Sequence, residues 1–140
     1  MKMGLSAEIK NAVNWEAPAV AMDDSLRVVI QKMVDSKSSA VLVKSGDAVV
    51  GIVTDMDMLG SIARHDDLDG TKASGFMTRC ELILGKAVKS PCVQLDAEQS
   101  VGDAIGVMNG AGIHHLVVSG EDDKCAGMVS VLDLLRLVIS

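Results

Sequence analysis

Aromatic residues are almost absent from this sequence of 140 residues, which contains Trp15, Phe76 and no tyrosine. Proteins that bind single-stranded nucleic acid depend on aromatic side chains on which the bases stack. The formal net charge is −6, and no stripe of lysine and arginine offers a footprint for a phosphate backbone. We therefore expect no nucleic-acid partner and a core built from aliphatic residues and the 9 methionines.

Cysteines and long apolar runs are also scarce. The three cysteines, Cys80, Cys92 and Cys125, are odd in number and lack the C-x-x-C spacing of metal and redox motifs. We expect reduced thiols and no bound metal. No apolar run approaches the roughly 18 residues that span a membrane, and no apolar signal segment follows Met1-Lys2. The sequence predicts a soluble, cytoplasmic protein without a membrane partner.

What the sequence does contain is an internal duplication. The pattern G-x-x-[ST]-x-x-D occurs twice, each time where an apolar, β-branched run gives way to a helical pattern. The first copy consists of Gly51, Thr54 and Asp57, and the second of Gly127, Ser130 and Asp133. The matching positions are 76 residues apart at all three places, so the copies align without a gap. Two copies in register indicate that the whole chain is duplicated.

The residue patterns in each half of the chain predict the element order β-α-β-β-α. The first half has strand patterns near 19–22, 38–43 and 48–53, and helical patterns that start at Ser25 and Thr54. The second half has strand patterns near 92–95, 113–118 and 125–129, and helical patterns that start at Ser100 and Ser130. Asn109-Gly110-Ala111-Gly112 is expected to break the helix that starts at Ser100.

The repeat boundaries follow from these patterns. We place the first repeat at 1–71, with an N-terminal helix that carries Leu5 and Ile9 and an acidic connector at 65–70. The second repeat is placed at 72–140. The predicted class is α+β. Neither half is large enough to cover both faces of its own sheet, so the two repeats should pack together as a pseudo-two-fold pair.

The motif residues suit either a ligand or a helix cap. A hydroxyl at a helix N-terminus lies beside free N–H groups, where an anion is favoured. A carboxylate one turn later can accept hydrogen bonds from two neighbouring hydroxyls, as a ribose would offer. However, Thr54-x-x-Asp57 and Ser130-x-x-Asp133 are also capping boxes, which need no ligand. The glycine lets either a ligand or another backbone approach closely.

Two β-α-β-β-α units that each end in this motif resemble a tandem pair of CBS domains, a Bateman module. The resemblance covers almost the whole chain. Phe76-Met77-Thr78 is similar to the segment that leads into the second repeat of such pairs, and 38–43 and 113–118 are similar to the family's central strand. This chain differs in having no proline in either central strand and in a long stretch, 79–90, before the second repeat.

The resemblance implies a site for an adenosine ligand in clefts between the repeats. In such pairs the motif aspartate commonly contacts the ribose hydroxyls, and the Ser or Thr contacts the ribose or a phosphate. A basic residue at the start of the central strand can contact phosphate; His114 and His115 match in the second half, against Ser39 and Ala40 in the first. AMP, ADP or ATP are the expected ligands, and S-adenosylmethionine or a NAD-type ligand is an alternative. The two sites should differ.

We therefore expect a regulatory sensor that acts on another protein and not an enzyme, since no Walker, G-x-G-x-x-G or H-E-x-x-H motif is present. One alternative is a structural dimerisation module with degenerate clefts. Another is a metal or redox sensor that uses the cysteines with His65, His114 and His115, although their spacing matches no zinc pattern.

Self-association is expected through the helices that follow the two motifs. Apolar residues surround nearly the whole helix at 132–139, and one stripe facing the core accounts for only part of them. Met56, Met58, Leu59 and Ile62 give the matching helix a similar surplus. Exposed apolar surface of this kind is uncommon on a monomer. CBS pairs commonly dimerise through these helices, so the resemblance implies a homodimer.

Overall fold

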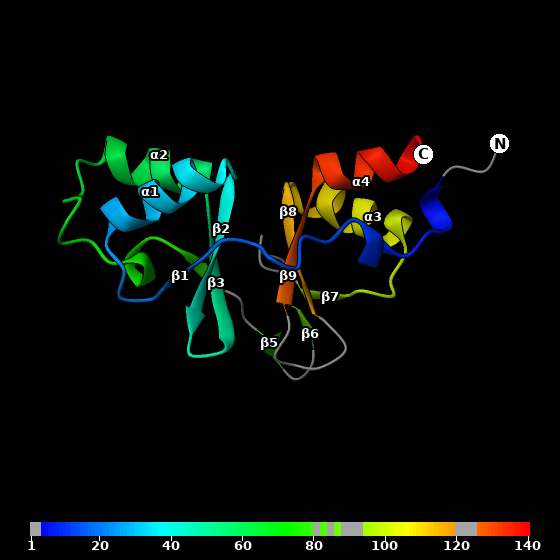
Figure 1. Cartoon of the computed structure of the whole chain (residues 1–140), viewed down its shortest axis with the longest axis horizontal. Coiled ribbons are helices and arrows are strands. Elements are labelled where there is room, and N and C mark those ends of the chain that lie inside the picture. The colour runs from blue at the N-terminus through cyan, green and yellow to red at the C-terminus, as the bar shows by residue number, and fades with distance from the viewer. Residues whose placement is uncertain (1–3, 80–81, 84–85, 88–93, 120–125) are drawn as a thin grey trace. The chain divides into compact units, whose positions relative to one another are not determined.

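The computed structural model describes residues 4–79, 82–83, 86–87, 94–119 and 126–140. Contacts divide the chain into two units, which we name by their repeats. The first-repeat unit is Ala17–Glu81, and the second-repeat unit combines Met1–Glu16 with Leu82–Ser140. In each unit two α-helices lie on one side of a sheet (Figure 1). This mixed α and β architecture, with two similar halves, confirms the predicted fold class.

The first-repeat unit contains a four-stranded sheet in the order β1-β2-β3-β4. Its elements are β1 (Ala19–Ala21), α1 (Leu26–Ser36), β2 (Ala40–Ser45), β3 (Ala48–Thr54), α2 (Asp55–Ala63), the 3₁₀ turn η3 (Ala73–Gly75) and β4 (Thr78–Arg79). β1 runs parallel to β2, whereas β2–β3 and β3–β4 are antiparallel. The element order expected between residues 19 and 64 is therefore confirmed.

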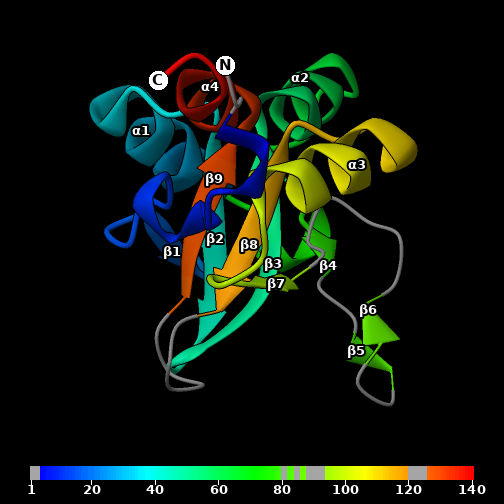
Figure 2. The same cartoon turned by 90° about the vertical axis from the view of Figure 1, so that its right-hand side faces the viewer.

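The second-repeat unit contains a three-stranded sheet in the order β7-β8-β9. Its elements are the 3₁₀ turns η1 (Gly4–Ser6) and η2 (Ile9–Asn11), the strand pair β5 (Leu82–Ile83) and β6 (Lys86–Ala87), β7 (Gln94–Asp96), α3 (Val101–Ala111), β8 (His115–Ser119), β9 (Ala126–Ser130) and α4 (Val131–Val138). Again the first sheet pairing is parallel and the second antiparallel. Figure 2 shows β9 leading directly into α4.

Each unit has an aliphatic core between its sheet and its two helices. In the first-repeat unit, alternate strand residues such as Val41 and Val43 pack against Leu26 and Val29 of α1 and Met58 of α2. The second-repeat unit is built likewise, and its core includes Leu116, Val118, Val129, Ala104 and Leu134. The apolar residues that alternate along the strands thus pack against the apolar residues spaced three apart on the helices, as the sequence patterns predict.

Caps fix where the first helix of each repeat begins and ends. Ser25 Oγ accepts a hydrogen bond from the Val28 N–H, and Ser100 Oγ accepts one from the Asp103 N–H. Both helices end on a left-handed residue, Lys37 after α1 and Gly112 after α3. α3 therefore continues through 109–111 and ends at Gly112, later than the expected break, because the glycine supplies its C-terminal cap.

The segment that leads into each repeat packs on the other repeat's unit. Glu8 pairs with Ser100 and Asn14 with Met128, while Lys72 pairs with Ser25 and Thr78 with Ile52. We call residues 8–15 and 72–79 the leading segments. Residues 8 and 14 correspond to 72 and 78 at a constant spacing of 64. The helices that follow the two leading segments, α1 and α3, start 75 residues apart. The second repeat therefore has 11 more residues than the first between its leading segment and its first helix, where the sequence has its long 79–90 stretch.

The prediction of an N-terminal helix that carries Leu5 and Ile9 is wrong. Residues 4–16 form two short 3₁₀ turns, and their backbone hydrogen bonds go to the second repeat: the Ile9 N–H donates to the Gln99 oxygen at 2.9 Å, and the Val101 N–H donates to the Ala7 oxygen at 2.8 Å. Ile9 is fully buried in the second-repeat core. The contact units therefore divide the chain differently from the expected repeats at 1–71 and 72–140.

The acidic connector at 65–70 is held by hydrogen bonds. The buried Ser61 donates a 2.6 Å hydrogen bond to Asp66, which with the nearby Arg64 lowers the pKa of the Asp66 carboxyl. Arg27 donates to Asp69 at 2.7 Å and lowers the pKa of that carboxyl. A carboxylate whose pKa is lower in the folded than in the unfolded state stabilises the fold at any pH above its unfolded-state pKa. This stabilisation is lost as the pH falls through the folded-state pKa.

Candidate functional site

The second copy of the motif forms the junction between β9 and α4. The Ser130 N–H and the Ser130 hydroxyl both donate to Asp133 Oδ2, each at 2.9 Å. In return the Asp133 N–H donates to Ser130 Oγ at 3.3 Å. This is a complete capping box. The other carboxylate oxygen, Oδ1, lies 3.4 Å from Arg136 Nη1.

The first copy has the same geometry between β3 and α2. The Thr54 N–H donates to Asp57 Oδ2 at 2.9 Å, and the Thr54 hydroxyl donates to the same oxygen at 3.2 Å. The Asp57 N–H donates to Thr54 Oγ1 at 3.3 Å. The capping boxes predicted from the sequence are thus both present. In each copy the cap engages one carboxylate oxygen through these two bonds, and a carboxylate has acceptor capacity beyond them.

A backbone hydrogen bond joins the start of the central strand to each motif helix. The Val131 N–H donates to the His114 carbonyl oxygen at 3.1 Å, and the Asp55 N–H donates to the Ser39 carbonyl oxygen at 2.9 Å. The next residues along are strand partners of the motif hydroxyls, with His115 opposite Ser130 and Ala40 opposite Thr54. In each unit the structure therefore brings the expected strand residues beside the expected Ser or Thr and Asp.

The two histidines differ in exposure. His115 is only 7% exposed, whereas His114 is exposed at the start of β8. The first repeat shows the same alternation, since Ser39 is exposed and Ala40 is fully buried. His114 and Ser39 are thus the exposed strand-side members of the expected set, and the Asp133 side chain beside them is 28% exposed.

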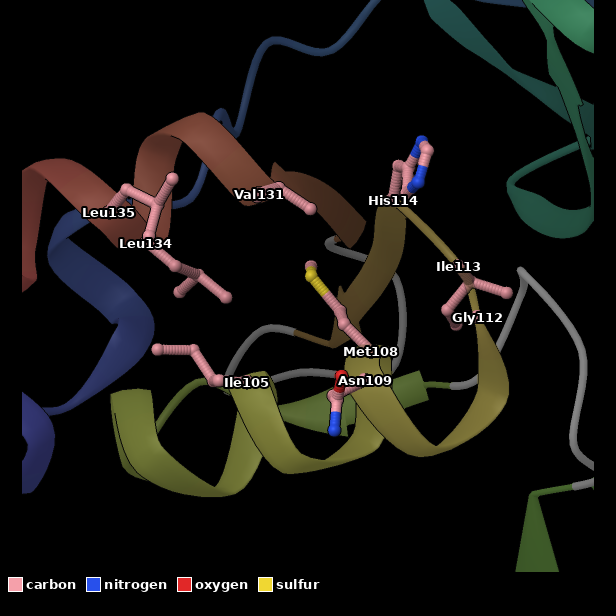
Figure 3. Close-up of a pocket in the computed structure, with 9 residues that line it drawn as sticks. All are labelled: Ile105, Met108, Asn109, Gly112, Ile113, His114, Val131, Leu134 and Leu135. Atoms are coloured by element: carbon pink, nitrogen blue, oxygen red, sulfur yellow. The ribbon is translucent and has the colours of Figure 1, made fainter.

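Each unit has a pocket beside this junction. In the second-repeat unit the pocket has a volume of about 310 Å³, and Figure 3 shows residues of α3, α4 and the start of β8 around it. Ile105 and Met108 reach it from α3, Val131 and Leu134 from α4, and His114 stands at its rim (Figure 3). Ser130 and Asp133 immediately neighbour two of these lining residues in sequence. The apolar lining was expected only as core, because an i, i+3 pattern does not distinguish a packed face from a pocket wall.

The first-repeat unit has a pocket of about 440 Å³ in the corresponding place. Its lining residues come from α1, α2 and the turn before β2: Ile30, Met33, Val34, Lys37, Ser38, Ser39, Met58 and Ile62. Seven of them have partners in the other pocket at the repeat spacing of 75 or 76 residues, including Met33 with Met108 and Ser39 with His114. Lys37 was not singled out from the sequence; no glycine or proline marks its turn.

The motif glycines face the chain's own leading segments. A Cβ placed on Gly51 would lie 2.9 Å from the Thr78 carbonyl oxygen, and one on Gly127 would lie 2.9 Å from the Asn14 carbonyl oxygen. Of the two partners expected for these glycines, a ligand or another backbone, the structure provides the backbone. We therefore assign both glycines a packing role beside the junction.

The described residues lack two features of other protein classes. No helix among them is long and apolar enough to cross a membrane. Within the same part of the chain, no three His, Cys, Asp or Glu side chains gather as metal ligands would. Cys80, Cys92 and Cys125, which the metal or redox alternative needs, lie outside the described residues.

Known proteins share both the sequence pattern and the fold. The chain is 27% identical over 125 residues to the uncharacterized protein MJ1404 of Methanocaldococcus jannaschii, covering 89% of this chain and 27% of that protein. It is 25% identical over 130 residues to the arabinose 5-phosphate isomerase KpsF of Escherichia coli, covering 92% of this chain and 36% of that protein. The chain therefore spans about a quarter to a third of the length of these curated relatives.

Solved structures match nearly the whole chain. The CBS domain structure NE2398 superposes with a TM-score of 0.78 at 24% identity and covers 95% of this chain and 98% of its own. The CBS domain protein PAE2072 from Pyrobaculum aerophilum, solved with AMP, gives 0.75 at 17% identity, with coverages of 95% and 99%. The CBS pair of MJ0100, solved with 5′-methylthioadenosine and S-adenosyl-L-methionine, gives 0.75 at 16%, with coverages of 94% and 98%.

The family model of the CBS domain matches the chain twice, at residues 9–64 and 84–140. These two matches cover most of the sequence and coincide with the two halves that carry the repeated motif. The resemblance noted in the sequence is thereby confirmed. This chain belongs to the CBS domain family and holds a pair of its domains.

Proposed function

We propose that this CBS pair is a non-catalytic regulatory module that binds an adenosine ligand, with AMP, ADP or ATP as the leading candidates. The observation that carries the proposal is the junction in each unit, where an exposed strand residue, a helix N-terminus and a motif carboxylate meet beside a pocket. Ligand binding would be transmitted to a regulated protein.

The chemistry of the junction suits a nucleoside with an anionic group. The carboxylates of Asp57 and Asp133 can accept hydrogen bonds from ribose hydroxyls with the capacity that the cap leaves over. Thr54 and Ser130 lie at helix N-termini, where the helix dipole favours a phosphate. The apolar pocket walls offer a surface for the adenine ring. The adenosine ligands of PAE2072 and MJ0100 support this ligand class.

Binding should stabilise the fold against heat. A ligand at ten times its Kd adds about 1.4 kcal/mol to the free energy of unfolding. For a chain of this size we expect the melting temperature to rise by roughly 5 °C. The measurement is a thermal-shift panel of AMP, ADP, ATP, S-adenosylmethionine and NAD, with GTP and CTP as controls for base recognition.

The controls in this panel separate the alternatives. Equal shifts from all nucleotides would indicate generic phosphate binding and not an adenosine site. If no adenosine compound changes the melting temperature at millimolar concentration, the proposed ligand class is wrong and the structural dimerisation module is favoured.

We also propose that the chain self-associates through α2 and α4. Both helices expose large apolar side chains: Met56, Leu59 and Ile62 on α2, and Leu132, Leu135 and Ile139 on or next to α4. Leu59 is 60% exposed and Leu132 63%. A second copy of the chain is the proposed occupant of these faces, because the same apolar surplus recurs on both motif helices. The hexameric CBS-CP12 protein, a fold relative, supports self-association in general.

Light scattering should therefore give about twice the 14.6 kDa chain mass at micromolar concentration. Replacing Leu59 and Leu132 together with glutamate should convert the protein to the monomer mass, because two charges would be buried without partners in the interface. Val34→Glu is the matched control, since Val34 is 64% exposed on α1, outside the proposed interface. A wild-type mass near that of one chain would contradict the homodimer.

A further inference from the structure

The lining of the first-repeat pocket includes a cationic side chain. Its walls are apolar, formed by α1 and α2, while the consecutive residues Lys37, Ser38 and Ser39 supply its polar lining. Among the described residues that line it, Lys37 is the one charged side chain. No described carboxylate lies within ion-pair distance of the Lys37 ammonium. The pocket thus offers an unpaired positive charge beside apolar surface.

Lys37 is also held in a backbone conformation that lysine disfavours. Its φ and ψ are 52° and 37°, in the left-handed region. The equivalent residue of the second repeat is Gly112, with φ and ψ of 67° and 37°. Glycine adopts this conformation without steric cost, whereas a side chain adds strain. The same helix end therefore carries a strained lysine in one repeat and an unstrained glycine in the other.

The two pockets consequently differ in charge. Lys37 places an ammonium group in the lining of the first pocket. The second pocket has Gly112 at that position and His114 two residues later, so its described lining contains no ammonium group. The sequence suggested the reverse asymmetry, with the basic residue in the second repeat alone.

We propose that Lys37 binds the phosphate of a nucleoside phosphate in the first-repeat pocket, so that this pocket selects phosphorylated over neutral adenosine compounds. The proposal rests on the function proposed above and adds a residue and a ligand class to one of its two sites. The ring would contact the apolar walls, and the phosphate would lie against Lys37, next to Ser38 and Ser39.

Methionine methyl groups give each pocket its own probe. Met58 lines the first pocket and Met108 the second, so ¹³C-methyl methionine spectra report a Kd for each site separately. Assignment comes from Met58→Leu and Met108→Leu. AMP and adenosine are titrated into wild type, Lys37→Gln, Lys37→Arg and Lys37→Gly. Lys32→Gln is the control, because Lys32 is exposed on α1 and makes the same change in net charge outside the pocket.

We expect Lys37→Gln to weaken AMP binding at Met58 about tenfold, the loss of one charge-assisted bond. AMP binding at Met108 and adenosine binding at Met58 should be unchanged. Lys37→Arg should retain most of the affinity. Lys37→Gly should lose AMP affinity while raising the melting temperature, because it removes the backbone strain. Lys32→Gln should behave as wild type.

Four results would overturn the inference. If Lys37→Gln weakens AMP and adenosine equally, or weakens neither, Lys37 does not bind the phosphate and the proposed function stands. The same holds if AMP perturbs only Met108. If no adenosine compound perturbs either methyl group, the proposed function fails together with the inference.

Discussion

Replacing Asp133 with alanine is expected to weaken AMP binding at the second-repeat site at least tenfold, and up to about a hundredfold. Hydrogen bonds to a charged group contribute roughly 1.5–3 kcal/mol each, and about 1.4 kcal/mol corresponds to a factor of ten. The apo fold should lose only about 1 kcal/mol, because Asp133 also closes the capping box of α4. A large loss of affinity with a small loss of stability identifies the carboxylate as a ligand contact.

Ser100→Ala is the matched control for the capping role. Ser100 caps α3 in the same unit through a 3.0 Å bond from the Asp103 N–H and lies outside the junction between β9 and α4. The Ser100→Ala variant should lose a similar amount of stability as Asp133→Ala and bind AMP with unchanged affinity. Asp57→Ala applies the same test to the first repeat. If calorimetry shows that neither aspartate variant loses more than about twofold in affinity while wild type binds, both carboxylates are caps only.

Replacing Gly127 with alanine is expected to destabilise the fold by about 3 kcal/mol, at the upper end of overpacking effects. The added Cβ would overlap Val13 Cγ1 and lie 2.9 Å from both the Asn14 carbonyl oxygen and Trp15 Cε3. The leading segment cannot easily move away from the added Cβ, because Asn14 and Met128, the residue after Gly127, exchange two backbone hydrogen bonds of 2.8 and 3.1 Å. The melting temperature should fall by roughly 10 °C.

Gly106→Ala should have the opposite effect. Gly106 lies inside α3 of the same unit, and nothing is within 4 Å of a Cβ placed there. Alanine is favoured over glycine in a helix by about 1 kcal/mol, so this variant should be more stable than wild type. Trp15, the single tryptophan, provides a fluorescence probe of the affected segment. Equal stability of the Gly127→Ala and Gly106→Ala variants would show that residues 13–15 of the leading segment can shift to accommodate the added methyl group at little cost.

Local patterns were sufficient for most of the fold. Serine caps, period-2 strands and i, i+3 helical faces predicted the elements of both repeats, because each pattern is satisfied within its own unit. The N-terminal segment was mispredicted because its partners are far away in sequence. Its apolar spacing suits a helix, yet Ile9 and Asn14 are held by hydrogen bonds to Gln99 and Met128, which no local period encodes.

The candidate site was predictable only where the motif repeats. The duplication indicated Thr54, Asp57, Ser130 and Asp133, and the structure places the strand residues beside them. Which histidine is exposed depends on the register of β8 with β9, and alternation alone leaves both choices open. Lys37 was not predicted because its place in the pocket lining depends on a left-handed turn that the sequence marks with glycine only in the other repeat.

Because of the leading segments, the compact units of the structure do not coincide with the repeats of the sequence. A cut between Thr71 and Lys72 would give two fragments, each carrying a piece of the other's unit and lacking a piece of its own. Fragments of this kind should need each other to complete their structures. A single repeat could fill its gap only by accepting the leading segment of a second copy. The chain thus has the arrangement of a domain-swapped dimer whose two copies are joined end to end.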